Sequence, residues 1–262
     1  MRCSFSFDNE ANLNEQSQEF LESLRSERRD LLTRLRQTQF STLKAGYSQF
    51  QVVPHATYAP WRDDSHFEQL YSRLREYTLV DVYRCYELYY LARQSERVAG
   101  DLVEVGVWRG GTGAILAAAL PRRRLHLFDT FQGVVKADSR FDTKYQGGEH
   151  ADADREAVLE LFSSLGLSCD VHVGVFPDDT REGLPDAIAL AHVDVDTYSS
   201  AKESFYAIWP TVQQGGVVVF DDYGFWGCEG VAQAVNELRQ EVPDALFVHN
   251  LNGHALMFKA NR

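Results

Sequence analysis

The 262-residue sequence predicts an α/β protein with a doubly wound, mostly parallel sheet and an antiparallel last strand. Short apolar runs alternate with stretches that carry apolar residues at helical spacing, which is the pattern of parallel strands joined by helices. A glycine-rich turn, residues 106–113, follows the first of these runs. The last two runs, 245–250 and 254–259, are separated by Asn252 and Gly253, a hairpin turn that reverses the chain.

The composition limits the partners that the chain can have. Lys and Arg number 26 against 38 Asp and Glu, so the formal net charge is −12. Such a charge argues against a nucleic acid or an anionic membrane as partner. The four cysteines are scattered without a C-x-x-C pair, which is typical of a reduced protein. No stretch has the apolar pattern of a leader or the length of a transmembrane helix, so we expect a cytoplasmic protein.

The first 65 residues are expected to form a polar arm, an amphipathic helix and a linker, separate from a domain over residues 66–262. Residues 15–40 carry apolar side chains spaced for one face of a helix. These are Phe20, Leu21, Leu24, Leu31, Leu32 and Leu35. Such a stripe packs on the protein's own core, covers the active site as a lid, or contacts a second copy of the chain. We expect a homodimer or a larger homo-oligomer. Residues 41–65 show no period and are expected to form the linker.

A strand and the glycine-rich turn follow two expected helices within residues 67–94. The strand covers residues 101–105, and the turn leads into a strong helix-forming stretch. The spacing in the turn is E-x-G-x-x-x-G-G, not the G-x-G-x-x-G of dinucleotide-binding turns. Asp129 ends the next strand, residues 124–129, at the position that binds ribose hydroxyls in nucleoside-binding sheets. The turn and this aspartate together predict a nucleoside ligand.

The middle of the domain contains a candidate mobile lid, residues 130–155, which is rich in glycine and in charged residues. A helix over residues 155–165 and a strand over residues 169–174 follow it. Near the end of the chain, a helix over residues 230–242 precedes the terminal hairpin. The order of these elements is that of a doubly wound sheet.

Aspartates are expected to converge at one rim of the sheet. Two apolar runs, 188–195 and 217–220, flank a helical stretch over residues 198–212 that is closed by a Gly-Gly pair, which predicts parallel strands. Their carboxyl ends bring together Asp194, Asp196, Asp221 and Asp222. Four neighbouring carboxylates repel one another unless a cation or protons neutralise them, so we predict a divalent-metal site. Asp196 is also a candidate N-cap of the helix that begins near Ser199.

Taken together, these motifs resemble the S-adenosylmethionine-dependent methyltransferases of class I, which have a seven-stranded Rossmann-like sheet. More narrowly, the chain resembles the macrocin O-methyltransferase (TylF-like) family over residues 78–260. The resemblance is carried by GDLVEVGVWRGGTGA, LFDTFQG, VGVFPDDT, HVDVDTY and VVVFDDYGFWGCEGVAQAVNEL. It implies an enzyme that uses S-adenosylmethionine and Mg²⁺ to methylate a sugar hydroxyl of a glycosylated natural product, such as an antibiotic. Residues 134–150 and the first 65 residues depart from the family's pattern.

The resemblance also implies roles for individual residues. The cofactor would be held by Glu104, Gly106, Trp108, Arg109, Gly110, Gly111, Asp129, Val175 and Phe176. Within this set, Asp129 would bind the ribose. The metal would be bound by Asp194, Asp221 and Asp222. Asp196 would be the general base, with His150 as the alternative. His192 is the third candidate, which we interpret as a paired histidine of the core.

The chemistry requires an aligned and activated hydroxyl, because the methyl group of a sulfonium is already activated. A Mg²⁺ ion held by carboxylates keeps open positions for two neighbouring hydroxyls, and a nearby free carboxylate accepts the proton. A catechol-type methyltransferase acting on a phenolic diol would use the same parts and remains the alternative. Two other classes are a non-catalytic nucleoside-binding module and an NAD-dependent enzyme. The four aspartates argue against the first, and the missing G-x-G-x-x-G argues against the second.

Overall fold

The computed structural model describes residues 15–36 and 58–260 and divides the chain into two compact units, Met1–Thr57 and Tyr58–Arg262. The first unit contains the helix α1 (Glu15–Arg36). Its apolar side chains Phe20, Leu24 and Leu31 are exposed. The predicted arm, the end of the predicted helix at residues 37–40 and most of the predicted linker lie outside the described residues.

The second unit contains a seven-stranded sheet in the order β3-β2-β1-β4-β5-β7-β6. The strands are β1 (Asp101–Val105), β2 (Leu125–Asp129), β3 (Asp170–Val173), β4 (Ile188–Val193), β5 (Val212–Phe220), β6 (Leu246–His249) and β7 (Ala255–Phe258). The first five pair in parallel, and β7 pairs antiparallel with both β5 and β6. The predicted fold class and its reversed last strand are therefore confirmed.

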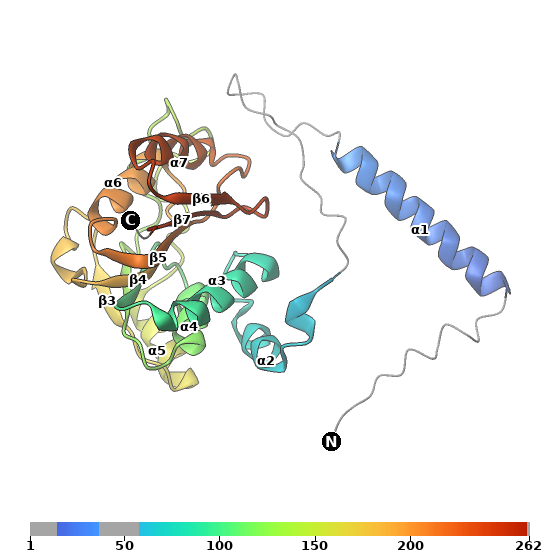
Figure 1. Ribbon diagram of the computed structural model, residues 1–262, viewed down its shortest axis with the longest axis horizontal. Helices are drawn as coiled ribbons and strands as arrows, with labels where there is room; N and C mark the ends of the chain where they lie inside the picture. Colours follow the sequence, from blue (N-terminus) through green and yellow to red (C-terminus); the bar gives the residue numbers. More distant parts are fainter. Residues whose placement is uncertain (1–14, 37–57, 261–262) are drawn as a thin grey trace. The chain divides into compact units, whose positions relative to one another are not determined.

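Helices cover both faces of the sheet. They are α2 (Ser65–Leu74), α3 (Val82–Gln94), α4 (Gly111–Ala119), α5 (Arg155–Leu165), α6 (Tyr198–Ile208) and α7 (Glu229–Glu241). Short 3-10 turns occur at Pro60–Arg62, Ser95–Arg97 and Arg181–Gly183. Figure 1 shows α3, α4 and α5 on one side of the sheet and α6 and α7 on the other. None of the helices in the described ranges is long and apolar enough to cross a membrane.

The core lies between the sheet and the helices α2 to α5. The strands contribute Leu102, Leu190 and Val219, and the helices contribute Leu88 and Ile115, all without exposed surface. Side-chain caps fix where these helices begin. The carboxylates of Asp64, Asp81 and Asp154 accept hydrogen bonds from the first-turn backbone amides of α2, α3 and α5. Free thiols are present at Cys85, Cys169 and Cys228.

The segment between α6 and β5 corrects two expectations. The helix ends at Ile208, so Val212 begins the strand and does not end the helix. The Gly-Gly pair is not a turn before the strand but lies within it, where Gly215 has a φ of 81° and the pairing with β4 shifts register. Helix α6 has Thr197 at its N-cap position, and its Tyr198 amide donates to Asp142 at 2.9 Å, so Asp196 does not cap it.

Candidate active site

A pocket of about 310 Å³ lies at the carboxyl ends of the central strands. One wall contains the glycine-rich turn after β1 and the end of β2, including Gly106 and Asp129. The opposite wall contains the ends of β4 and β5, including Asp194 and Asp222. The remaining walls come from residues 77–80 before α3 and from the loop between β2 and α5. The topology of a parallel sheet places ligands at this edge.

The glycine-rich turn has a conformation that its sequence makes possible. Gly106 has a φ of 85°, and a Cβ atom there would lie 1.7 Å from the backbone oxygen of Asp194. Only glycine fits, because the turn and β4 touch through their backbones. The carboxylate of Asp129 fixes the turn from the other side. Its Oδ2 accepts hydrogen bonds from the amides of Val107 at 2.6 Å and Trp108 at 3.0 Å.

An aromatic surface continues this wall. Phe176 lines the pocket, is 5% exposed, and packs on Phe128 of β2 with ring centroids 4.7 Å apart. Trp108 also lines the pocket, and its Nε1 donates to Asp152 of the loop at 2.7 Å. An apolar face next to a hydrogen-bonding carboxylate suits a flat heterocycle that is joined to a ribose.

The acidic wall contains three partly buried carboxylates, those of Asp194, Asp196 and Asp222. Asp196 and Asp222 have φ values of 62° and 58°, which non-glycine residues rarely adopt. Two more pocket residues, Trp108 and His150, have φ values of 48° and 63°. Backbone strain of this kind clusters at functional sites, where the surrounding structure maintains it.

Burial and, after it, repulsion between neighbouring carboxylates raise the pKa values of this wall. Burial, and then the charges of Asp221 and Asp222, raises the pKa of Asp194 well above its ordinary value. Burial and the charge of Asp222 raise the pKa of Asp196 to about 7, and the Asp196 carboxyl hydrogen bonds to Tyr145 and Asp222. The pKa of Asp222 is raised by burial and by Asp221. An all-oxygen donor set with excess negative charge fits a Mg²⁺ ion.

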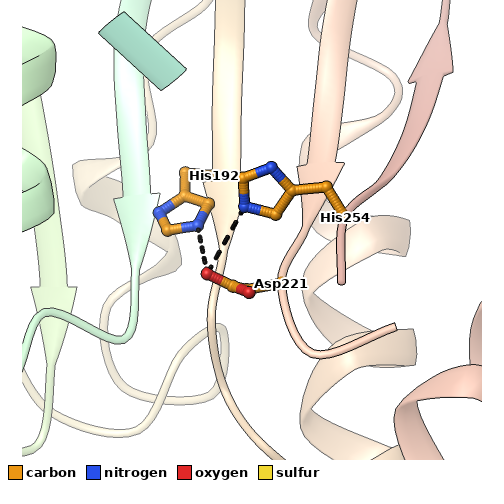
Figure 2. A group of neighbouring side chains, drawn as sticks. All are labelled: His192, Asp221 and His254. Atoms are coloured by element: carbon orange, nitrogen blue, oxygen red, sulfur yellow. Dashed lines mark hydrogen bonds and ion pairs between the residues drawn. The ribbon is translucent and has the colours of Figure 1, made fainter. Parts of the chain in front are cut away.

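Asp221 differs from these three aspartates in its surroundings. It is buried and does not line the pocket. Its Oδ1 accepts a hydrogen bond from the guanidinium of Arg84. Its Oδ2 lies 3.3 Å from His192 Nε2 and 3.5 Å from His254 Nε2. Figure 2 shows both imidazoles directed at this one oxygen. These cationic partners outweigh burial and hold the pKa of Asp221 well below its ordinary value.

The pocket brings together most of the residues predicted for the site. It is lined by Gly106, Trp108, Asp129, His150, Phe176, Asp194, Asp196 and Asp222. It is not lined by Glu104, Arg109, Gly110, Gly111, Val175 or Asp221.

The predicted residues outside the pocket have other contacts. Glu104 has no exposed surface, and its Oε1 lies 2.9 Å from His192 Nδ1. This contact agrees with our interpretation of His192 as a paired core histidine. Arg109 pairs with Asp152 at 2.6 Å. Gly110 is the N-cap residue of α4, and Gly111 is its first residue. Glu104 and Arg109 do not line the pocket, and their contact with a cofactor stays a prediction.

Several lining residues could not be identified from the sequence. Residues 77–80, Arg84, Tyr145 and Phe225 all border the pocket. Arg84 is on α3, whose apolar spacing gave no indication that one of its arginines is buried. Tyr145 comes from the loop expected to form a lid. This loop is held to the rest of the unit by Asp142, which accepts from Tyr198, and by Thr143, which donates to Glu229 at 2.8 Å.

Comparisons with known families and curated proteins found related methyltransferases. A family model described as macrocin-O-methyltransferase (TylF) matches residues 70–257. A tetracenomycin-C 4'-O-methyltransferase of Streptomyces olivaceus is 32% identical over 180 residues, which cover 62% of this chain and 67% of that protein. The mycinamicin III 3''-O-methyltransferase of Micromonospora griseorubida is 29% identical over 182 residues, covering 62% of this chain and 70% of that protein.

Solved structures share the fold. The O-methyltransferase NovP superimposes with a TM-score of 0.60 at 23% identity, covering 71% of this chain and 83% of that chain. The calicheamicin methyltransferase CalS11 superimposes with a TM-score of 0.57 at 19% identity, covering 75% and 94% of the two chains. Similarities at this level of identity show the architecture alone.

Proposed function

The chain belongs to the macrocin O-methyltransferase (TylF) family, and from that premise we propose that it transfers a methyl group from S-adenosylmethionine to a sugar hydroxyl of a glycosylated natural product. The observation that carries the proposal is one pocket with two different walls. The glycine-rich turn and Asp129 form one wall, and Asp194, Asp196 and Asp222 form the other. The relatives named as a rhamnosyl-tetracenomycin-C 4'-O-methyltransferase and a mycinamicin III 3''-O-methyltransferase support the acceptor class.

The first wall would hold the methyl donor. Asp129 has hydrogen-bonding capacity beyond the two amides that its Oδ2 accepts, since each carboxylate oxygen has two lone pairs. It would accept from the ribose hydroxyls while continuing to fix the turn. Phe176 would pack against the adenine ring. The backbone contact at Gly106 keeps this wall close to Asp194, so the donor and the acidic wall share one small volume.

The second wall would hold the metal and the acceptor hydroxyl. When bound, S-adenosylmethionine supplies an activated methyl group and Mg²⁺ supplies Lewis acidity at the acceptor oxygen. Asp194 and Asp222 face the pocket and, together with the buried Asp221, would bind the ion. Asp196 lies at the same wall and would accept the hydroxyl proton as general base. His150 lines the same pocket and is the alternative base.

Isothermal titration calorimetry with S-adenosylmethionine and NAD, followed by an acceptor screen, tests this function. We expect S-adenosylmethionine to bind and NAD not to bind. Among acceptors, we expect turnover with glycosides that carry adjacent sugar hydroxyls, loss of turnover in EDTA and recovery with Mg²⁺. Turnover of catechols without turnover of glycosides would instead support a phenolic acceptor. Binding of NAD without S-adenosylmethionine would refute a methyltransferase, and full turnover in EDTA would refute the metal.

A further inference from the structure

Among the residues that the structure describes, three large apolar side chains both line the pocket and are exposed to solvent. Leu79 is 66% exposed, and Tyr77 and Phe225 are each 40% exposed. Tyr77 and Leu79 precede α3, and Phe225 follows β5. Single exposed apolar side chains are normal on a protein surface, whereas a group of them beside a ligand pocket marks a contact surface. We call these three residues the apolar rim.

The segment that carries Tyr77 and Leu79 is held in place by its backbone. The Tyr77 amide donates to the carbonyl of Leu74 at 2.8 Å, and the Tyr77 carbonyl accepts from Gly111 at 2.9 Å. A Cβ atom on Gly111 would lie 2.5 Å from that carbonyl oxygen, so glycine permits the close approach. Leu74 and Val80, on either side of the segment, are buried in the core. Leu79 is therefore exposed on a fixed backbone.

The ring of Phe225 is fixed by contacts with two other parts of the chain. The guanidinium of Arg84 lies 4.5 Å from the centre of the ring. On Gly253, a Cβ atom would lie 2.1 Å from Cε2 of the ring, so the ring packs against that backbone. The Phe225 amide donates to the carbonyl of Asp222 at 3.0 Å, which keeps the ring next to the acidic wall. A ring that is already held loses little conformational freedom when a ligand packs on it.

The size of the pocket indicates what would contact the apolar rim. The pocket volume is about 310 Å³. This value is at the lower end of the range, about 300–1,000 Å³, of sites that hold one drug-sized ligand. The proposed reaction needs two ligands, a methyl donor and an acceptor, so the donor and one sugar ring are enough to fill this volume. The rest of a glycosylated acceptor must then lie outside, against the side chains where the pocket opens.

We propose that the apolar rim binds the aglycone of the acceptor, and that this aglycone is large, flat and apolar. The inference rests on the proposed function, because it takes methyl transfer to a sugar as given. A flat aglycone would cover the exposed parts of Tyr77, Leu79 and Phe225 while its sugar reaches the acidic wall. A nucleoside-diphosphate sugar would instead bring an anionic diphosphate to these apolar side chains, where it would lose hydration without gaining a partner. The rim therefore favours methylation after a glycosyl transfer has joined the sugar to its scaffold.

Pairs of glycosides test the inference. The two members of a pair carry the same sugar, joined either to a methyl group or to umbelliferone, a flat fluorescent coumarin. For each sugar that is turned over, the measured quantity is the ratio of kcat/KM for the umbelliferyl glycoside to kcat/KM for the methyl glycoside. We expect this ratio to be about 10 or more in wild type, through a lower KM, because the coumarin buries apolar surface on the rim.

Variants of the rim should bring the ratio closer to one. We expect Leu79→Ser and Phe225→Ala each to lower it by about three-fold or more. Phe225 also packs on Arg84, but a loss of turnover that is common to both glycosides leaves the ratio unchanged. The matched control is Leu246→Ser, because Leu246 is 60% exposed on β6 and does not line the pocket. This control should keep the wild-type ratio.

A ratio near one in wild type, or one that the rim variants leave unchanged, overturns the inference. Higher kcat/KM with a nucleoside-diphosphate sugar than with the umbelliferyl glycoside also overturns it. So does a lower mass of Leu79→Ser in light scattering with an unchanged ratio, because the rim would then be a contact between copies of the chain. If wild type turns over no glycoside, the proposed function is refuted, and binding of free umbelliferone, followed by its fluorescence, decides the inference. Leu79→Ser should bind it more weakly than wild type and Leu246→Ser, and equal affinities overturn the inference.

Discussion

Two carboxylates at the same sheet edge acquire opposite properties from their neighbours. Asp221 lies among Arg84, His192 and His254, which stabilise its ionised form. Asp196 has Tyr145 and another carboxylate, Asp222, beside it, and burial adds to the cost of its charge. Both are aspartates that follow parallel strands at this edge, and their opposite pKa shifts come from burial and from the side chains that surround them.

At the scale of this residue, Asp196→Asn tests the assignment of the base. The amide keeps the size of the carboxylate but cannot accept the hydroxyl proton. We expect kcat to fall by about 10²–10⁴-fold, while the affinity for S-adenosylmethionine, measured by calorimetry, stays unchanged. The same substitution should leave Mn²⁺ binding within a few-fold of wild type. Loss of Mn²⁺ would make Asp196 a metal ligand, and the matching variant His150→Gln would then be expected to lose activity.

At the scale of secondary-structure elements, the site depends on the close approach of the turn after β1 to the end of β4. Gly106 and Gly166 both have positive φ values, 85° and 68°. A Cβ atom on Gly166 would meet nothing within 4 Å, whereas one on Gly106 would meet the backbone of Asp194. Alanine substitutions at these two glycines therefore distinguish the cost of backbone strain alone from the cost of a steric clash with β4.

We expect Gly166→Ala to cost about 1 kcal/mol of unfolding free energy, since only the left-handed conformation is penalised. Gly106→Ala should cost several times more, because the turn must move away from β4. It should also weaken S-adenosylmethionine binding, which Gly166→Ala should leave intact. Chemical denaturation and calorimetry on the two variants measure both effects. Equal losses would show that the close approach is not required.

At the scale of the whole molecule, the buried acidic wall makes stability depend on pH. The pKa of Asp196 is raised from 3.8 to about 7, so the folded protein keeps a proton that the unfolded chain has released. The free energy of unfolding of the metal-free protein should therefore fall as pH rises from about 4 to about 7. His192 contributes in the same direction. Its pKa is raised from 6.5 to about 10, so the free energy of unfolding that it contributes decreases as the pH rises above 6.5.

Differential scanning fluorimetry between pH 5.5 and 8 measures this dependence. We expect the metal-free melting temperature to fall by on the order of 5 °C across the range. Mg²⁺ should restore most of the loss at pH 8, since a bound cation replaces the protons that neutralised the wall. Asp196→Asn should flatten the profile. A melting temperature that rises with pH would contradict the electrostatics described for this wall.

The amphipathic helix α1 leads to a prediction about assembly. Phe20, Leu24 and Leu31 are 64%, 43% and 50% exposed, so among the described residues this helix presents an exposed apolar stripe. We predict a homodimer or larger assembly that uses this stripe. Light scattering should give a multiple of the monomer mass for the full chain and the monomer mass for residues 58–262. Phe20→Ser with Leu24→Ser should also give monomers, and an unchanged mass in every protein would contradict the prediction.

The sequence alone determined the layout of this domain and the location of its site. Apolar runs, helical spacing and glycines are local signals. They were enough to predict seven strands, the antiparallel direction of the last strand, and the sheet edge where Asp129, Asp194 and Asp222 meet. The start of β5 at Val212 was missed, because a glycine pair within a strand looks like a turn unless the register with β4 is known.

Only the tertiary structure shows which of the site's carboxylates have cationic partners and which do not. Sequence could place four aspartates at one rim, but not that Arg84, more than 100 positions earlier in the chain, contacts Asp221 and Asp222. Nor could it show that Glu104 lies under the pocket against His192. A carboxylate's role depends on burial and on partners from other elements, and these depend on packing between helix and sheet, which has no local signature in the sequence.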